Sequence, residues 1–232
     1  MAIAFVRANI VGRSNGQSAV ASAAYRSGER LHDDRYAKTH DYGRKGGIVA
    51  AGIEAPEGSP SWVFDREMLW NQVEAVERRK DSQLARELIL ALPHELDRAN
   101  QVELARGFAA FLAAQGMGVD WAVHLPSKRG ADTNVHAHLL CTTREITHDG
   151  FGGKEAGSRA RSWNQDAWMD STKRQYEAMA NERLRARGYA PISFEERAGK
   201  GGEHLGPVAT ATKRREDAKL EKYEIELKKE LN

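Results

Sequence analysis

Short apolar runs and amphipathic stretches follow one another along the chain, and their spacing predicts strands and helices in mixed order. Strands are predicted at residues 3–11, 48–53, 84–92, 119–125 and 134–141. Helices, recognised by apolar residues three and four positions apart, are predicted at residues 18–26, 65–79, 97–115 and 163–187. Since the last two strands form a hairpin and helices separate the others, an α+β fold is expected, with one mainly antiparallel central sheet and helices packed against it.

Residues at the boundaries of the predicted helices support these assignments. Asp65 and Asp97 stand where an N-cap is needed, and Gly28 and Gly188 follow helix ends. The inward faces of the second and third helices are predicted to consist of Met68, Leu69, Val73 and Val76, and of Leu104, Phe108, Phe111 and Leu112.

Three histidines lie in the predicted hairpin, His124 in its first strand and His136 and His138 in its second. Side chains alternate along a strand, so His136 and His138 point the same way, with α-carbons about 7 Å apart. Pairing His124 opposite either of them brings all three imidazoles to one face. Such a cluster is typical of a catalytic metal site with positions left for water or substrate. The alternative is that these are ordinary hydrogen-bonded strand histidines.

The composition is ordinary for a soluble globular protein and permits one large domain or two small ones, with 232 residues of which 41% are hydrophobic and 29% charged. There is no run of about 18 apolar residues, so no membrane span is expected, and the start of the chain does not look like a signal peptide. The single cysteine, Cys141, excludes an internal disulfide and favours a cytoplasmic location. Within an apolar strand, Cys141 is expected to pack in the core.

The net charge of +2 is unevenly distributed, because residues 1–50 carry +4, residues 51–153 carry −5 and residues 154–200 carry +3. The two basic segments would form a groove for a polyanion if the fold brought them together. Charge therefore permits a nucleic acid partner without requiring one.

The later part of the chain is expected to divide at about residue 207. Residues 151–162 form a Gly-rich basic loop and residues 198–206 a flexible Gly-rich stretch. From Val208 onward a charged helix is predicted, which could dock on the domain, pair with a partner or begin a further region. Its narrow apolar stripe consists of Leu220, Tyr223, Leu227 and Leu231.

Tyr25, at the end of the first predicted helix, is a candidate nucleophile. A phenol can form a covalent intermediate when a metal or base lowers its effective pKa. Small residues at positions 21–24 allow close approach of sheet or substrate, and Arg26 adds a positive charge. A helical tyrosine can equally be a half-buried packing residue. No helical His-Glu-x-x-His motif occurs, which argues against a peptidase.

Several of these residues fall in an ordered set of motifs that spans roughly residues 1–210. The set comprises Ser22-Ala23-Ala24-Tyr25-Arg26-Ser27-Gly28 with Leu31 and Asp33, then Arg86-Glu87-Leu88-Ile89-Leu90-Ala91-Leu92-Pro93, then His124, then His136-Ala137-His138. Trp163, Trp168, Asn181 and Leu184, followed by His204-Leu205-Gly206-Pro207, complete it. Together they resemble the MobA/MobL family of plasmid mobilisation relaxases, within the histidine–hydrophobic–histidine endonucleases.

The resemblance implies a relaxase domain over residues 1–207, built as a two-layer sandwich like relaxases and rolling-circle initiators, with residues 208–232 as an appended helix. Tyr25 would attack one phosphodiester of single-stranded origin-of-transfer DNA. The products would be a 5′-phosphotyrosine link and a free 3′-hydroxyl, which permits rejoining after transfer. The setting would be the cytoplasm of a bacterium.

The resemblance also implies roles for the site residues. His124, His136 and His138 would hold Mn²⁺ or Mg²⁺, and Zn²⁺ could also bind; imidazole suits Mn²⁺ better than Mg²⁺. Glu87 matches a glutamate near the family's active site and would activate the tyrosine or orient a histidine, unless it is only a charge at a strand end.

DNA contacts are expected from basic and aromatic residues along the chain. The candidates are Arg7, Arg13, Arg26, Lys128, Arg129, Arg159, Arg161, Trp163 and Trp168. By resemblance, the partners are single-stranded DNA with an adjacent hairpin or duplex at a transfer origin, relaxosome accessory proteins and a coupling protein.

Three other functions would use the same residues. A rolling-circle replication initiator has the same chemistry, but the tyrosine precedes the histidines here, which favours the conjugative family. A DNA-binding accessory protein would use the histidines structurally and would unfold when metal is removed. A metal-dependent hydrolase acting through water would stay active without Tyr25.

Overall fold

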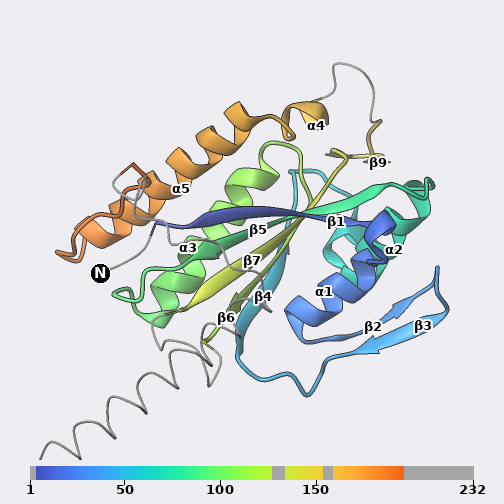
Figure 1. Ribbon diagram of the computed structural model, residues 1–232, viewed down its shortest axis with the longest axis horizontal. Helices are drawn as coiled ribbons and strands as arrows, with labels where there is room; N and C mark the ends of the chain where they lie inside the picture. The colour runs from blue at the N-terminus through green and yellow to red at the C-terminus, as the bar shows by residue number, and fades with distance from the viewer. Residues whose placement is uncertain (1–3, 127–133, 154–158, 196–232) are drawn as a thin grey trace, which may run out of the picture. The chain divides into compact units, whose positions relative to one another are not determined.

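The computed structural model describes residues 4–126, 134–153 and 159–195 (Figure 1). The chain divides into two units, Met1–Phe194 and Glu195–Asn232, and nearly all of the second unit falls outside the described residues. The division predicted at residue 207, the Gly-rich stretch at 198–206 and the charged helix after Val208 therefore lie outside the described residues. No helix in the described part is long and apolar enough to cross a membrane.

The core of the first unit is a five-stranded sheet in which every neighbouring pair of strands is antiparallel. Its strands, in spatial order, are β1 (Val6–Gly12), β5 (Gln83–Ala91), β7 (His136–Thr142), β6 (Val119–His124) and β4 (Ile48–Glu54). All five predicted strands are confirmed. The fold class, α+β with a mainly antiparallel central sheet, is confirmed with them.

Two small ribbons accompany the central sheet. One pairs β2 (Arg30–Asp33) with β3 (Lys38–Asp41), and the other pairs β8 (Ile146–Thr147) with β9 (Gly150–Phe151). The sequence did not indicate the first ribbon, because its strands are rich in charged residues and His and contain little apolar alternation. The second falls partly within the stretch predicted as a loop at residues 151–162.

Helices cover both faces of the sheet (Figure 1). They are α1 (Ala19–Ser27), α2 (Arg66–Val76), α3 (Arg98–Ala113), α4 (Arg159–Ser162) and α5 (Asp166–Arg185), with 3-10 turns η1 (Arg13–Asn15) and η2 (Ser61–Phe64). α3 and α5 pack on one face, and α1 and α2 pack on the other. The sheet thus has helices packed against each of its faces.

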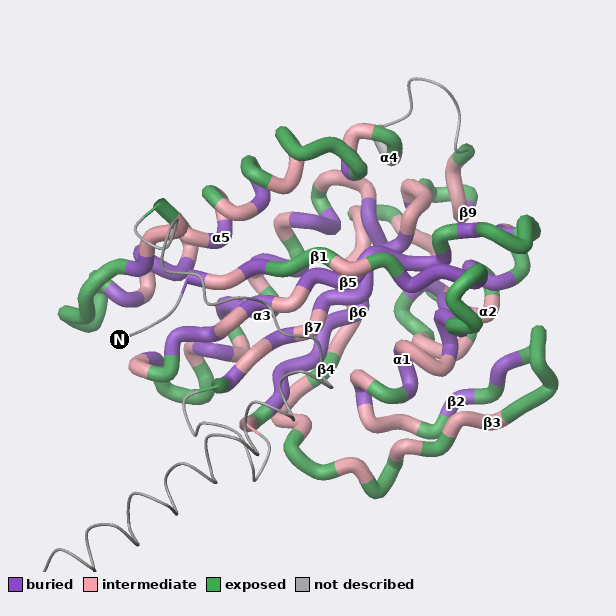
Figure 2. Tube along the Cα trace, in the orientation of Figure 1, coloured by how far each residue is buried: buried purple, intermediate pink, exposed green. Residues whose placement is uncertain are grey.

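Two hydrophobic clusters follow from this arrangement, and the middle strands are buried between them (Figure 2). On the α3–α5 face the cluster includes Phe108, Leu139 and Tyr176, while Leu69 and Leu140 belong to the cluster on the α1–α2 face. Successive side chains of β7 therefore pack into different clusters, one on each face of the sheet.

The helix caps form where the sequence placed them. The side chain of Asp65 accepts from the Met68 N–H at 2.9 Å, and that of Asp97 from the Asn100 N–H at 2.8 Å. α2 ends at Val76, three residues before the predicted end. Its buried face was also predicted incorrectly in part: Met68 is 49% exposed, and Trp70 is buried instead, where its Nε1–H reaches Asp120.

Candidate metal centre and active site

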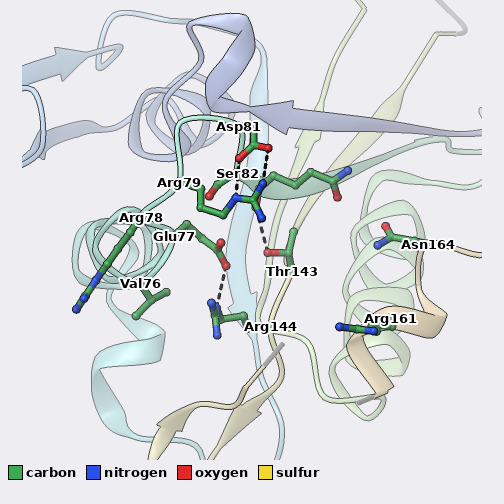
Figure 3. A pocket seen from close by; sticks show the side chains of 11 residues that line it. Val76, Glu77, Arg78, Arg79, Asp81, Ser82, Thr143, Arg144, Arg161 and Asn164 are labelled. Atoms are coloured by element: carbon green, nitrogen blue, oxygen red, sulfur yellow. Dashed lines mark hydrogen bonds and ion pairs between the residues drawn. The ribbon is translucent and has the colours of Figure 1, made fainter. Parts of the chain in front are cut away.

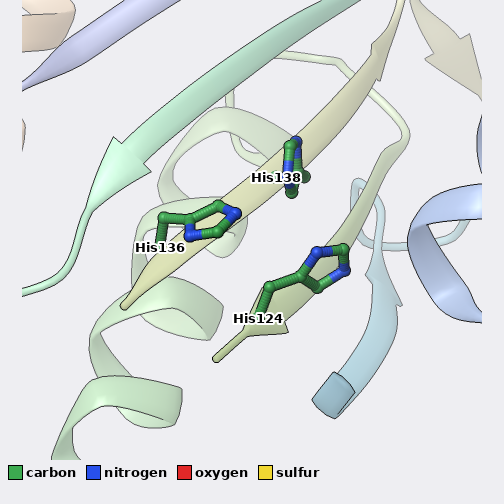
Figure 4. Close-up of side chains that lie close together, drawn as sticks. All are labelled: His124, His136 and His138. Carbon is green, nitrogen blue, oxygen red and sulfur yellow. The ribbon is translucent and has the colours of Figure 1, made fainter. Parts of the chain in front are cut away.

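The three histidines predicted to bind a metal lie together at one end of the central sheet (Figure 4). His124 stands opposite His136 in the β6–β7 register, and the alternation of β7 brings His138 to the same face. Their ring centroids lie between 4.7 and 5.6 Å apart, and one nitrogen from each ring lies within 4.8 Å of the others. The convergence of the side chains is confirmed; the bound metal stays a prediction.

Two of these imidazoles are oriented by backbone carbonyl groups. His136 Nδ1 lies 3.0 Å from the Asn134 carbonyl oxygen, and His124 Nε2 lies 2.7 Å from the Arg26 carbonyl oxygen. Because a carbonyl oxygen only accepts hydrogen bonds, the nitrogen facing it carries the proton. The other nitrogen of each neutral ring then keeps a lone pair for a metal.

Glu87, on β5, orients the third imidazole. Its Oε1 accepts from His138 Nδ1 at 2.7 Å and from Arg26 Nε at 2.6 Å, and its Oε2 accepts from Asn9 at 3.3 Å. Burial favours a higher pKa for Glu87, but the hydrogen bonds from His138 and Arg26 outweigh it and hold that pKa well below its ordinary value. An ionised carboxylate at Nδ1 leaves Nε2 of His138 available to a metal. Glu87 is buried and is not a surface charge.

Two of the histidines, His124 and His136, are placed where they stay neutral near pH 7. Burial lowers the pKa of His124 to about 4, against a hydrogen bond to the Arg26 carbonyl that favours the charged form. Burial also lowers the pKa of His136. A neutral imidazole is the form that binds a metal. The donor set, three nitrogens with fixed lone pairs, fits a divalent ion that accepts imidazole, such as Mn²⁺ or Zn²⁺.

Tyr25 occupies the last turn of α1, and the end of this helix contacts the histidine cluster. The following residue, Arg26, contacts His124 through its carbonyl oxygen and Glu87 through its side chain. Tyr25 itself is 48% exposed, so its hydroxyl-bearing ring is accessible from solvent. Gly28 ends the helix with φ +72°, and a Cβ there would lie 2.4 Å from Ile48 Cδ1. This close turn holds the end of α1 against β4.

Two residues near Tyr25 and Glu87 were not singled out from the sequence. Lys45 Nζ lies 3.5 Å from the centroid of the Tyr25 ring, and Asn9 donates to Glu87. Lys45 belongs to a turn with no chemical motif, so nothing local indicated its target. For Asn9 the signal was available, since alternation along β1 places it on the same face as Arg7.

Two predicted DNA contacts do not fit the structure. Arg13 is 9% exposed, and its guanidinium forms a 2.6 Å ion pair with Glu74. The Arg13 guanidinium is therefore already paired inside the protein. Trp163 is 2% exposed and packs in the hydrophobic cluster on the α3–α5 face, so its ring has no open face for a base. Both residues hold the fold together.

The remaining candidates differ in accessibility. Arg7 is exposed on the sheet face that carries the histidines, since it pairs with Ile89, which pairs with His138. Trp168 is partly buried, with its Nε1–H bonded to Gln115. The side chain of Arg26 is 16% exposed and paired with Glu87, and that of Arg161 is exposed. Lys128, Arg129 and the side chain of Arg159 lie outside the described residues.

A pocket of about 650 Å³ lies at the opposite end of the sheet (Figure 3). Four arginines line it, namely Arg78, Arg79, Arg144 and Arg161. Arg79 forms a two-pronged ion pair with Asp81, and Arg144 pairs with the buried Glu77 at 2.8 Å. No histidine or tyrosine lines it, so the chemistry of the histidine cluster lies elsewhere.

Comparisons with known proteins agree with this geometry. A family model described as "MobA/MobL family" matches residues 17–215. The mobilization protein MobL of Acidithiobacillus ferridurans is 33% identical over 93% of this chain and 65% of its own length. The conjugal transfer protein TraA of Agrobacterium fabrum (strain C58 / ATCC 33970) is 40% identical over 67% of this chain. This chain spans only 15% of TraA.

Two solved structures extend the comparison. One, described as "Molecular Basis of Vancomycin Resistance Transfer in Staphylococcus aureus", shares 35% identity with a TM-score of 0.76 and covers 83% of this chain and 98% of that chain. A metal-free structure of the conjugative relaxase TrwC with oriT DNA has a TM-score of 0.51 at 11% identity, covering 80% of this chain and 71% of that chain. The second likeness concerns the fold alone.

Proposed function

This chain belongs to the MobA/MobL family, and from that premise we propose that it is the nicking domain of a DNA relaxase. Its substrate is single-stranded DNA next to a hairpin or duplex at a transfer origin. The observation that carries the proposal is the junction of α1 with the histidine cluster, where the residue after Tyr25 contacts both His124 and Glu87.

The protein's own groups supply most of what the reaction needs. The phenol oxygen of Tyr25 bonds to phosphorus, the bond from phosphorus to the 3′ oxygen breaks, and the 3′ oxygen leaves as a hydroxyl after taking up a proton. Glu87 holds His138 in one tautomer, and the two carbonyl contacts do the same for His124 and His136. When bound by these histidines, a divalent ion such as Mn²⁺ polarises the scissile phosphate.

The 5′-phosphotyrosine bond preserves the energy of the phosphodiester, so a 3′-hydroxyl can reverse the step and rejoin the strand. This reversibility is what transfer of a plasmid strand requires. The exposed Arg7, on the same sheet face as the cluster, is the best placed of the described basic candidates to bind phosphates near the nick. We place the protein in the bacterial cytoplasm, with accessory and coupling proteins as partners.

The test is covalent trapping. The protein is incubated with Mn²⁺ and pooled single-stranded oligonucleotides, and mass spectrometry identifies the tyrosine that carries nucleotide. Tyr25→Phe is expected to abolish the adduct, and chelation of Mn²⁺ is expected to do the same. Tyr36→Phe, an exposed tyrosine in the turn between β2 and β3, is the matched control and should leave the adduct intact.

Other outcomes identify other functions. Cleavage that survives Tyr25→Phe and turns over repeatedly indicates a hydrolase acting through water. An adduct that forms at a replication origin in preference to a transfer origin indicates a rolling-circle initiator. Unfolding on metal removal, with unchanged DNA binding by Tyr25→Phe and no cleavage by the wild type, indicates an accessory protein.

A further inference from the structure

Lys45 lies against Tyr25 in a way that its position in the sequence does not explain. Its Nζ is 3.5 Å from the centroid of the Tyr25 ring and donates a 2.5 Å hydrogen bond to the Tyr25 carbonyl oxygen. An ammonium within about 6 Å of a ring centroid is attracted by the electrons of that ring face. One side chain therefore binds both the backbone and the ring of the same residue.

The turn that carries Lys45 is fastened to the end of α1. Its backbone N–H donates to the Tyr42 carbonyl oxygen at 2.8 Å, and the Tyr42 N–H donates to the Glu29 carbonyl oxygen at 3.1 Å. The Tyr42 ring meets the Tyr25 ring edge-on, with centroids 5.3 Å apart and an interplanar angle of 87°. The Tyr25 ring is thus contacted by an ammonium on its face and by a second aromatic ring.

Lys45 is also electrically placed to act on both halves of the site. Burial, followed by the charge of Arg26, lowers the pKa of Lys45 to about 8, and no carboxylate contributes to that shift. Its positive charge in turn contributes to the lowered pKa values of His124 and His136. Within the described residues, Lys45 is thus a cation that contacts Tyr25 and also acts electrostatically on His124 and His136.

We propose that Lys45 is the positioning residue of Tyr25: it holds the ring against the end of α1 and stabilises the negative charge on the phenol oxygen. This inference rests on the proposed function. In nicking, the phenol loses its proton to solvent as its oxygen bonds to phosphorus and the bond to the 3′ oxygen breaks. In rejoining, the phenol oxygen is the leaving group and takes a proton back. The cation favours both directions because the phenol oxygen carries negative charge in each.

A purely structural role for Lys45, as a cap on the last turn of α1, predicts different behaviour. Removal of a cap changes stability and leaves the rate of a reaction at saturating substrate nearly untouched. If Lys45 positions Tyr25, its removal lowers that rate and alters the pH dependence of the rate, and replacement by arginine restores most of the rate. These readouts separate the two.

The experiment compares Lys45→Met, which keeps an unbranched side chain, with Lys45→Arg, which keeps the charge. Lys38→Met is the matched control, because Lys38 is an exposed lysine on the neighbouring β2–β3 ribbon. The probe is the oligonucleotide that the wild type cleaves, in the presence of Mn²⁺. Single-turnover formation of the Tyr25 adduct gives the rate, and anisotropy in a Tyr25→Phe background gives DNA affinity.

Lys45→Met is expected to slow adduct formation at saturating DNA about 10-fold, as a cation–π contact of about 1–2 kcal/mol predicts. Its DNA affinity should change less than about threefold. Lys45→Arg should recover most of the rate, and Lys38→Met should match the wild type. Wild-type rates for Lys45→Met, equal loss of rate and affinity, or no rescue by arginine would each overturn the proposal.

A spectroscopic measurement distinguishes failure here from failure of the proposed function. With fluorotyrosine incorporated, the Tyr25 signal is assigned by its absence in Tyr25→Phe. Lys45→Met should shift that signal and Lys38→Met should not. A shifted signal in a wild type that forms no adduct means that the contact is real and the proposed reaction is wrong. An unshifted signal with normal adduct formation rejects the role of Lys45 and keeps the relaxase.

Discussion

The two ends of the central sheet use charged and polar side chains in opposite ways. At the pocket end, arginines and carboxylates cancel in pairs, as in Arg79 with Asp81 and Arg144 with Glu77 (Figure 3). At the other end, His124, His136 and His138 converge, and each keeps a ring nitrogen that no hydrogen bond in the described residues occupies (Figure 4).

The difference shows that charged groups at the pocket end stabilise the fold, whereas polar groups at the histidine end remain available to bind a ligand. A buried ion pair such as Arg144 with Glu77 has little left to offer a ligand, and in the exposed pair of Arg79 with Asp81 the charges are likewise already matched. Lone pairs held in place by hydrogen bonds on the far side of each ring remain available at no further cost in ordering. A large pocket is therefore a poorer guide to chemistry here than a shallow cluster of oriented imidazoles.

The largest expected effect is a loss of metal affinity when one histidine of the cluster is removed. His136→Ala removes one of three donors, and Mn²⁺ affinity is expected to fall more than about 100-fold, beyond the 10–100-fold typical of losing an outer partner of a ligand. Isothermal titration calorimetry measures it. His148→Ala, at an exposed histidine between β8 and β9, is the control and should bind Mn²⁺ like the wild type. Equal affinities in both variants would remove the metal centre from consideration.

A second effect comes from the carboxylate behind the cluster. Glu87→Gln keeps the shape but loses the charge that fixes the Nδ1–H tautomer of His138, so Mn²⁺ affinity is expected to fall about 10–100-fold. Glu54→Gln, at a carboxylate on β4 paired with Arg106, is the control. The two-residue cycle sharpens the result, because Glu87→Gln should have little further effect once His138 is alanine. Full additivity in that cycle would show that Glu87 acts independently of His138.

The pocket end should respond in stability and not in metal binding. Glu77→Gln removes a buried charge that pairs with Arg144, and about 1–3 kcal/mol of unfolding free energy is expected to be lost. Urea denaturation of the metal-free protein measures the loss, and calorimetry should give an unchanged Mn²⁺ affinity. A weakened Mn²⁺ affinity would mean that the two ends of the sheet are coupled through β5 and β7 and do not act independently.

Features that depend on contacts between residues close in the sequence could be predicted, and features that depend on distant contacts could not. Alternation within one hairpin was enough to bring His124 to the face of His136 and His138, and helix caps correctly located the end of α1 and the start of α3. Arg13 was assigned to DNA because nothing near it in the chain hints at its buried ion pair with Glu74, which is 61 positions away.

The surroundings of Lys45 and Trp163 also depend on contacts that the local sequence does not indicate. Lys45 reaches Tyr25 only because the turn after β3 folds back on the end of α1, a contact between segments 20 positions apart. Trp163 looked like an exposed aromatic on an amphipathic helix, but α5 begins at Asp166, and Trp163 lies before it in the core. Side-chain periodicity does not determine how a loop before a helix packs.

The smallest effect concerns Cys141, which lies on β7 between the two ends but faces the opposite, apolar side of the sheet. Burial raises the pKa of its thiol from 9.0 to about 12, so the folded protein keeps the proton that the unfolded chain loses above pH 9. The folded state then binds more protons than the unfolded state, and stability must fall as pH rises from about 9 toward 12.

Cys141→Val removes this dependence while keeping an apolar side chain of similar size. The free energy of unfolding in urea is measured for both proteins at pH 8 and pH 10, so that lysines and tyrosines common to both cancel. The wild type should lose about 1 kcal/mol more than the variant between these pH values. An equal loss would mean that the thiol ionises in the folded protein, and the face of β7 opposite the histidines would then be open to water.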